Sequence, residues 1–296
     1  MKLAGKIEWP TLALVVGCYV VWGLGTTVLA QLSLPVGIVV TALAVALFAS
    51  LQHEIIHKHP FENQRLNEAL VFPGLTVLIP YLRFRDTHLD HHMNADLTDP
   101  YDDPESNYLD PKVWGRLPKT LRAVLRFNNT LMGRLSVGTA VSQVTFMCGD
   151  LRAIKDGDRR VLSGWLWHIP ALLLVAVWLI WFGAMPIWAY LIAAYIGLSL
   201  IKIRTFLEHQ AHERATGRTV VIEDRGFLAF LFLNNNFHVV HHCHPRVPWY
   251  RLPQLYTQNK DRFLTRNGSY VYRSYGEIFR RHFLKRKDPV PHPFWE

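Results

Sequence analysis

Four long, uncharged apolar segments constrain this fold more than any other feature of the sequence. They occupy residues 11–30, 36–53, 165–185 and 186–203, so they form two pairs separated by a long connection. About 20 apolar residues span the hydrocarbon core of a bilayer as a helix. Of the 296 residues 50% are hydrophobic although the net charge is +9, a combination unusual for a soluble globular protein. The sequence therefore predicts an all-α integral membrane protein with four transmembrane helices in two hairpins.

The basic residues predict how these spans are oriented. Lys and Arg are frequent in the connection 58–160 and in the tail 204–296, whereas the short connections around 31–35 and 183–186 carry no charge. Cytoplasmic loops of membrane proteins are enriched in Lys and Arg, so both termini and the long connection are predicted to be cytoplasmic. We expect a single membrane domain, 1–296, in which these two basic regions form a cytoplasmic helical cap. A bacterial inner membrane is the expected location.

Length and proline content constrain two further apolar segments and the third span. The segments 69–82 and 226–233 are too short to span a bilayer, and the first contains two prolines, so both are predicted to lie at the membrane interface or to re-enter it. Pro170 is predicted to lie in the first turns of the third span, where a missing backbone N–H is tolerated.

The 15 histidines are clustered, and nine of them fall into four groups beside the predicted spans and interfacial segments. The groups are His53 and His57; His88, His91 and His92; His209; and His238, His241 and His242. Residues at i, i+3 and i+4 share one face of a helix. Each group that contains more than one histidine can therefore direct two or three imidazoles toward one point. All four groups are predicted on the cytoplasmic side. We predict that these nine histidines bind metal, with His212 as a weaker substitute for His209.

The number of histidines favours two metal ions. Catalytic zinc takes three protein ligands and keeps one position open, whereas nine imidazoles suit two metals with four or five ligands each. Imidazole binds iron, copper, zinc and nickel alike. Two alternatives remain: a membrane zinc metalloprotease that uses His53-Glu54-x-x-His57, with Glu54 as the base, and a metal transporter. A transporter needs ligands inside its spans, yet spans one, three and four contain only His168.

The order H-x-x-x-H, H-x-x-H-H and H-x-x-H-H around paired hairpins resembles the membrane fatty-acid desaturase superfamily, over roughly residues 11 to 255. The resemblance implies two iron ions, O2 as co-substrate and electrons delivered from outside. It also implies that the three histidine boxes, His53 to His57, His88 to His92 and His238 to His242, ligate the irons. His209 matches the additional histidine that follows the last span. Thr205 stands where acyl-CoA desaturases have an asparagine that binds metal through water, which puts that contact in doubt.

Acidic and amide side chains beside these boxes are predicted to orient the ligating imidazoles. The predicted residues are Glu54, Asp90, Asp96, Asp99, Glu208 and Asn234. The acidic stretch 94–111 also has the composition of a series of turns. We expect one or two of the five candidate carboxylates, Glu54, Asp90, Asp96, Asp99 and Glu208, to orient a histidine.

The resemblance implies a fatty-acid desaturase that inserts a double bond into an acyl chain taken from the bilayer. A carotenoid ketolase or hydroxylase, or a hydrocarbon hydroxylase, is the alternative within the superfamily. The sequence shows no cytochrome b5 haem-binding segment, so electrons are expected from a separate ferredoxin, rubredoxin or reductase. A basic cytoplasmic face would attract acidic carriers, although the same charges also suit lipid headgroups. No nucleic-acid partner is expected.

Overall fold

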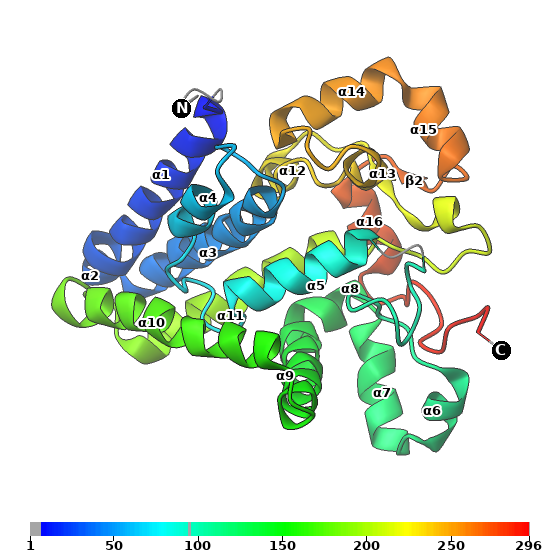
Figure 1. Ribbon diagram of the computed structural model, residues 1–296, viewed down its shortest axis with the longest axis horizontal. Helices are drawn as coiled ribbons and strands as arrows, with labels where there is room; N and C mark the ends of the chain where they lie inside the picture. The colour runs from blue at the N-terminus through cyan, green and yellow to red at the C-terminus, as the bar shows by residue number, and fades with distance from the viewer. Residues whose placement is uncertain (1–6, 94–95, 296) are drawn as a thin grey trace. The chain divides into compact units, whose positions relative to one another are not determined.

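Most of the residues that the structure describes, 7–93 and 96–295 of a computed structural model, form helices (Figure 1). The chain divides into two compact units. The first unit comprises residues 1–85 and 142–201, and the second comprises residues 86–141 and 202–296.

The first unit contains the apolar helices. Its elements are α1 (Trp9–Leu24), a π-helical segment (Gly25–Leu29), α2 (Ala30–Leu32), α3 (Leu34–Ile56), α4 (Gln64–Leu70), the start of α5 (Tyr81–Met93), most of α9 (Thr139–Lys155), α10 (Arg159–Trp181) and most of α11 (Ile187–Thr205). Among the described residues, four helical segments are long and apolar enough to cross a membrane: Trp9–Leu32, α3, α10 and α11. The predicted number of apolar spanning helices is thus confirmed. Asn63 starts α4 by accepting a hydrogen bond from the backbone N–H of Arg65.

The apolar helices of the first unit pack closely through small residues and satisfied polar groups. A Cβ atom on Gly197 of α11 would lie 2.7 Å from the carbonyl oxygen of Ala42 on α3, so this glycine permits close approach of the two helices. The indole N–H of Trp22 donates to the Tyr190 hydroxyl at 3.1 Å, and that hydroxyl donates to the Leu75 carbonyl at 2.8 Å. These bonds connect α1, α11 and the turns after α4, and they give the buried indole of Trp22 and the buried phenol of Tyr190 hydrogen-bond partners.

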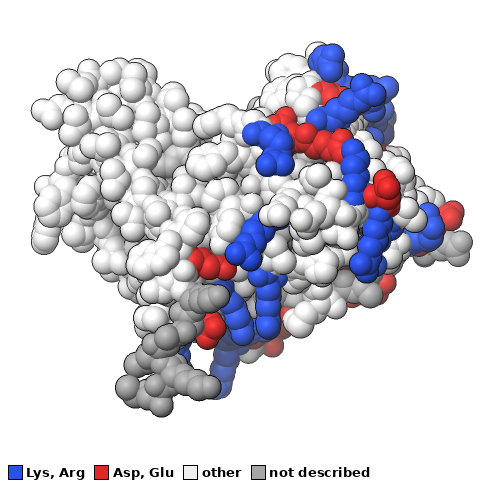
Figure 2. Space-filling view, turned by 90° about the horizontal axis from the view of Figure 1, so that it is seen from above, with Lys and Arg blue, Asp and Glu red and all other residues white. Residues whose placement is uncertain are grey.

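The outward faces of the long helices are apolar. Val16 of α1 is 56% exposed, and Trp167 and Ile180 of α10 are 56% and 66% exposed. Figure 2 shows one face of the molecule on which a broad area carries no charged residue. Exposed apolar area of this extent marks an interaction surface, and on helices of spanning length it suits contact with lipid tails.

Pro170 lies in the interior of α10, so its predicted place in the first turns of a span is wrong. The helix begins at Arg159 because Asp158 caps it, accepting hydrogen bonds from the backbone N–H groups of Arg160 and Val161 at 2.8 and 3.1 Å. A prediction based on the length of the apolar run misses this first turn, because the turn begins with two arginines.

The second unit contains shorter elements. They are the end of α5 (Tyr81–Met93), α6 (Pro111–Arg116), α7 (Lys119–Asn128), α8 (Leu131–Gly133), a π-helical segment (Arg134–Gly138), the start of α9 (Thr139–Lys155), a 3-10 helix (Ala215–Arg218), β1 (Val221–Ile222), α12 (Phe227–Leu231), α13 (His238–Cys243), a 3-10 helix (Trp249–Arg251), α14 (Leu252–Gln258), α15 (Lys260–Arg266), β2 (Val271–Tyr272) and α16 (Tyr275–His282). The strands β1 and β2 pair in parallel, with Val221 opposite Val271.

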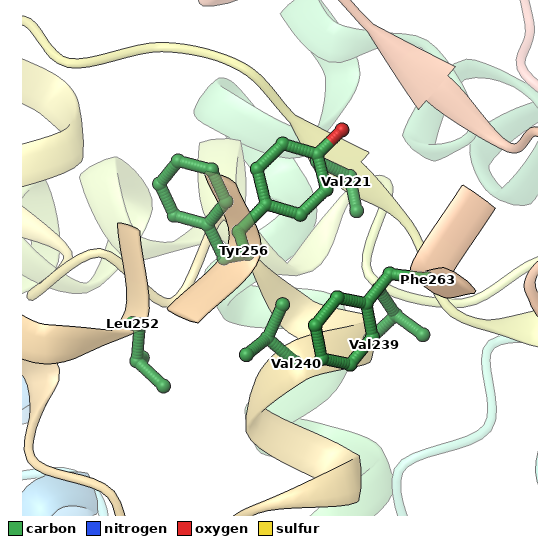
Figure 3. Close-up of a cluster of buried hydrophobic side chains, with 7 residues drawn as sticks. Val221, Val239, Val240, Leu252, Tyr256 and Phe263 are labelled. Carbon is green, nitrogen blue, oxygen red and sulfur yellow. The ribbon is translucent and has the colours of Figure 1, made fainter. Parts of the chain in front are cut away.

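An apolar cluster supports the helix that carries the last histidine box (Figure 3). Its buried members are Val221, Phe237, Val239, Val240, Leu252, Tyr256 and Phe263. The backbone N–H of Val239 also donates to the Val220 carbonyl at 3.1 Å, which ties α13 to the strand β1. The two valines inside the sequence His-Val-Val-His-His therefore anchor α13 in the core and fix the direction of its histidines.

Candidate metal centre

Two helices of the second unit present histidines at the same spacing. These are His88, His91 and His92 on α5, and His238, His241 and His242 on α13. The rings of the two helices meet: the centroids of His92 and His242 lie 4.4 Å apart, and those of His92 and His241 lie 4.8 Å apart. Because the spacing directs three rings from each helix the same way, the two boxes face each other.

Four histidines form a first group, which combines three separate segments. It consists of His91, His209, His238 and His242, whose ligand atoms all lie within 4.8 Å of one another. The Nε2 atom of His209 is 3.0 Å from those of His91 and His238, and the Nε2 atoms of His238 and His242 are 3.1 Å apart. Two nitrogens bound at about 2.1 Å at adjacent vertices of an octahedron would be about 3.0 Å apart.

His209 owes its position to the chain after α11. It forms an isolated antiparallel bridge with Thr219, and Lys287 Nζ donates a hydrogen bond to its backbone carbonyl. The Nδ1 atom of His209 is buried and has no hydrogen-bond partner among the described residues. Backbone contacts, rather than a carboxylate bonded to Nδ1, therefore position this histidine.

A buried aspartate determines the tautomer of His91. Asp103 Oδ1 lies 2.8 Å from His91 Nδ1, and the two side chains are 1% and 0% exposed. An ionised carboxylate can only accept a hydrogen bond, so Nδ1 of His91 carries the proton and Nε2 presents a lone pair to the group. Carboxylates orient metal-ligating histidines in this way in many metal sites.

Three histidines of the second unit form a second group, His88, His92 and His241, whose ligand atoms also lie within 4.8 Å of one another. His241 Nε2 and His92 Nε2 are 3.1 Å apart. Glu105 Oε1 lies 2.9 Å from His88 Nδ1, so a carboxylate orients this group as well. Glu105 follows Asp103 by two residues, and one loop therefore serves both groups.

Glu208 and the amide side chain of Asn235 lie beside His238. Asn235 donates to Glu208 at 2.9 Å and lies 3.4 Å from His238 Nδ1, while Glu208 is 3.7 Å from that nitrogen. Arg204 pairs with Glu208 at 2.8 Å. Burial raises the pKa of Glu208, which Arg204 opposes. Asn234, in contrast, donates to the Trp249 carbonyl at 3.1 Å.

Burial favours the neutral imidazole for most of these histidines, and His91 is the exception. Burial, followed by the charges of neighbouring histidines, holds the pKa of His209, His238 and His242 well below the usual range. The same causes lower the pKa of His92 to about 3. For His91, burial is outweighed by the carboxylates of Glu105 and Asp103, which raise its pKa to about 9.

The chemistry of the donors fits a metal ion. Neutral imidazoles that direct lone pairs at one point repel one another unless a cation lies between them, and imidazole is the commonest metal ligand in proteins. The histidine clusters are thus compatible with a site for two metal ions.

The first box lies in the first unit, at the end of α3. The ring centroids of His53 and His57 are 5.1 Å apart. Glu54, the base of the protease alternative, lies 3.8 Å from Nε2 of His59, whose Nδ1 lies 2.7 Å from Glu8. The buried Glu54 and His59 and the half-buried Glu8 therefore form a polar triad beside the box.

The remaining predicted residues have various surroundings. Asp90 and Asp96 are exposed, and Asp99 accepts backbone hydrogen bonds from Tyr101 and Asp102 in a turn. Thr205 Oγ1 is buried and has no hydrogen-bond partner among the described residues. Residues 94 and 95 of the acidic stretch lie outside the described residues.

Sequence reasoning did not single out Asp103 or Glu105, and it considered Asn235 only as part of the run Asn234 to Asn236. The signal for the first two was the acidic stretch itself, since histidine ligands need a carboxylate partner. The stretch offers several carboxylates, and their order along the chain does not indicate which ones turn back to α5.

Comparison with known proteins agrees with this site. The sequence model of the fatty acid desaturase family matches residues 10–274. The chain therefore belongs to the fatty acid desaturase family, a family of membrane oxidoreductases, and the four apolar helices indicate an integral membrane protein.

A chloroplastic omega-3 fatty acid desaturase of Brassica napus is 25% identical to this chain over 229 residues. The match covers 70% of this chain and 55% of the relative, so the chain spans about half the length of the curated protein it matches.

Proposed function

We propose that this protein is an O2-dependent di-iron oxidoreductase that inserts a double bond into a lipid acyl chain. The observation that carries the proposal is the first histidine group, in which four Nε2 atoms from three segments lie within 4.8 Å of one another. The family match over residues 10–274 supports it. A zinc protease needs three protein ligands for its one metal, so this separate group of four favours the desaturase.

The nine histidines divide between two irons in this proposal. His91, His209, His238 and His242 hold one iron. His88, His92 and His241 hold the other, and we propose that His53 and His57 of the first box complete its shell. The seven histidines of the second unit already provide two groups, and the H-x-x-x-H spacing of the first box would supply the missing ligands. Neutral imidazoles as the only protein ligands add no negative charge to the site.

The residues of this chain orient and tune the ligands. Asp103 and Glu105 each hold one histidine by its Nδ1 atom, which directs Nε2 toward the metal. When bound, the irons supply the reaction of O2 with an unactivated C–H bond. The protein holds the acyl chain and excludes water from it, and a separate ferredoxin, rubredoxin or reductase delivers the electrons. The Lys and Arg residues outside the spans would attract such an acidic carrier.

We propose that the four apolar helices form two hairpins with both termini on the cytoplasmic side, and that residues 58–160 and 204–296 form the cytoplasmic cap of one functional domain, 1–296. The absence of charge in the two short connections, 31–35 and 183–186, supports this orientation. A bacterial inner membrane suits the arrangement.

The test combines metal content with product analysis. Protein purified in detergent from iron-supplemented cells should contain two irons per chain, and His92→Ala should lose iron. Membranes of the expressing cells should contain a new double bond in their acyl chains, detected by mass spectrometry. A carotenoid or hydrocarbon product carrying new oxygen would instead identify the ketolase or hydroxylase alternatives. One zinc per chain, kept in His92→Ala and lost in His57→Ala, together with inactivation by Glu54→Gln, would establish the protease and refute the proposal.

A further inference from the structure

The first unit contains a cavity of about 390 Å³. Its wall is formed by the end of α3, by α4 and the turns that follow it, by the first residues of α5 and by α10. The volume lies within the range of small-molecule sites, which are mostly apolar with a few polar groups. We call it the α10 cavity.

Exposure indicates the direction in which the α10 cavity runs. Trp167 on the outer side of the wall is 56% exposed and belongs to the lipid-facing surface of α10, whereas Ala171, one helical turn further on, is 5% exposed. Gln52 on α3 is 4% exposed. The cavity therefore leads from an apolar outer surface to the buried end of α3. Gln52 is the residue immediately before His53 of the first box.

Both apolar and charged side chains line the α10 cavity. Phe72 and Trp167 are in edge contact, with ring centroids 6.3 Å apart. Glu68 pairs with Arg85 at 2.8 Å, so its charge is compensated. Arg65 on α4 is exposed and also lines the cavity, so it leaves a net positive charge at the outer edge of the cavity. The cavity thus suits a molecule with an apolar chain and an anionic head.

We propose that the α10 cavity binds the acyl chain of the substrate, with the anionic head at Arg65 and the chain running past Phe72 and Trp167 toward Gln52. The assignment rests on the proposed function, because Gln52 is bonded to a proposed iron ligand. A chain that reaches Gln52 ends at the helical turn of α3 on which the first histidine box begins. Phospholipid phosphate and free fatty-acid carboxylate share this head chemistry.

Photo-crosslinking of the full-length protein in nanodiscs tests this binding directly. One probe is a fatty acid with a diazirine in the middle of its chain, and the other is phosphatidylglycerol that carries the same chain. Mass spectrometry of the peptides locates the label. We expect label on Phe72 and Trp167, and the probe that produces it distinguishes the free acid from the phospholipid.

Two matched variants of α4 make the test specific. Ala69 lines the cavity and Leu66, 53% exposed on the same helix, does not. Ala69→Phe fills the space and should reduce labelling of Phe72 about tenfold at subsaturating probe, which corresponds to about 1.4 kcal/mol of binding free energy. Leu66→Phe should leave the labelling unchanged. Arg65→Gln should weaken labelling by the anionic probes but not by a fatty alcohol with the same chain.

The outcomes separate this inference from the proposed function, because crosslinking needs neither iron nor electrons. Labelling of Phe72 that Ala69→Phe reduces supports the cavity even if the protein contains no iron. Absence of label at Phe72, or equal labelling in Ala69→Phe, overturns the cavity assignment. That result would leave the proposed function in place if iron and a desaturated product are found.

Discussion

Asp103 provides the sharpest test of the metal centre. One of its oxygens lies 2.8 Å from His91 Nδ1 and 2.9 Å from the backbone nitrogen of Glu105, and the other accepts from the Thr98 N–H at 2.8 Å. In Asp103→Asn one oxygen becomes an NH2 group. Whichever way the amide points, its NH2 group faces either the N–H groups of His91 and Glu105 or the N–H of Thr98, so at least one donor loses its acceptor.

The size of the effect follows from these contacts. Loss of a carboxylate that orients a metal-ligating histidine typically weakens metal binding about 10–100-fold, or roughly 1.4–2.8 kcal/mol at about 1.4 kcal/mol per tenfold. A buried donor without an acceptor also costs the fold about 1–3 kcal/mol. Because the side chains of Asp103 and His91 are almost completely buried, water does not replace the lost contact. We expect both effects in Asp103→Asn.

The assay separates metal binding from folding. Metal content is measured after equilibration with increasing chelator, and the Tm of metal-free protein is measured in the same detergent. Asp102→Asn, an exposed change of the same charge in the same loop, serves as the control. If Asp103→Asn retains its metal at the same chelator concentrations as Asp102→Asn, the proposed role of Asp103 in orienting His91 is wrong.

Three further predictions concern the other polar contacts. Arg83→Met should lower the Tm strongly, because Arg83 donates twice at 2.9 Å to the buried Asp150 and breaking such a pair costs about 3–5 kcal/mol. Glu8→Gln should lower the Tm more at pH 6 than at pH 10. Burial lowers the pKa of His59, but Glu8 and Glu54 outweigh it and raise the pKa, so the pair stabilises fully below the unfolded value of 6.5 and is lost as pH rises through the raised pKa. His242→Ala should reduce metal content by about one ion per chain, since four-ligand sites need every ligand.

Each of these predictions has a matched control. Arg152→Met changes an exposed arginine on α9, Glu62→Gln an exposed glutamate near the first box, and His244→Ala an exposed histidine just after α13. If Arg152→Met lowers the Tm as much as Arg83→Met does, the proposed stabilisation by the buried pair of Arg83 and Asp150 is wrong. An effect of Glu8→Gln that grows with pH would contradict the assigned charge of His59. Unchanged metal content in His242→Ala would exclude that ring as a ligand.

Hydropathy and spacing alone determined the local features of this protein. Four helices of spanning length follow from runs of apolar residues, because a helix rises by a fixed amount per residue and a bilayer has a fixed thickness. The presentation of three rings on one face of α5 and of α13 follows from their i, i+3, i+4 spacing. Helix length and the facing of side chains depend on residues close together in the sequence, so they can be predicted without the tertiary structure.

The assignment of each histidine to its group was decided by tertiary structure. His91 joins His209 and the α13 histidines His238 and His242, whereas its neighbour His92 lies with His241. Successive residues on a helix point about 100° apart, so adjacent histidines of one box face different sites.

Tertiary structure also decided which carboxylates contact the histidines. The loop after α5 turns back through Thr98, whose φ of 74° is in the left-handed region, and it brings Asp103 and Glu105 to the histidines while Asp96 stays exposed. A hydrogen bond between a loop and a helix depends on how the whole loop folds against that helix. Sequence spacing carries no such information.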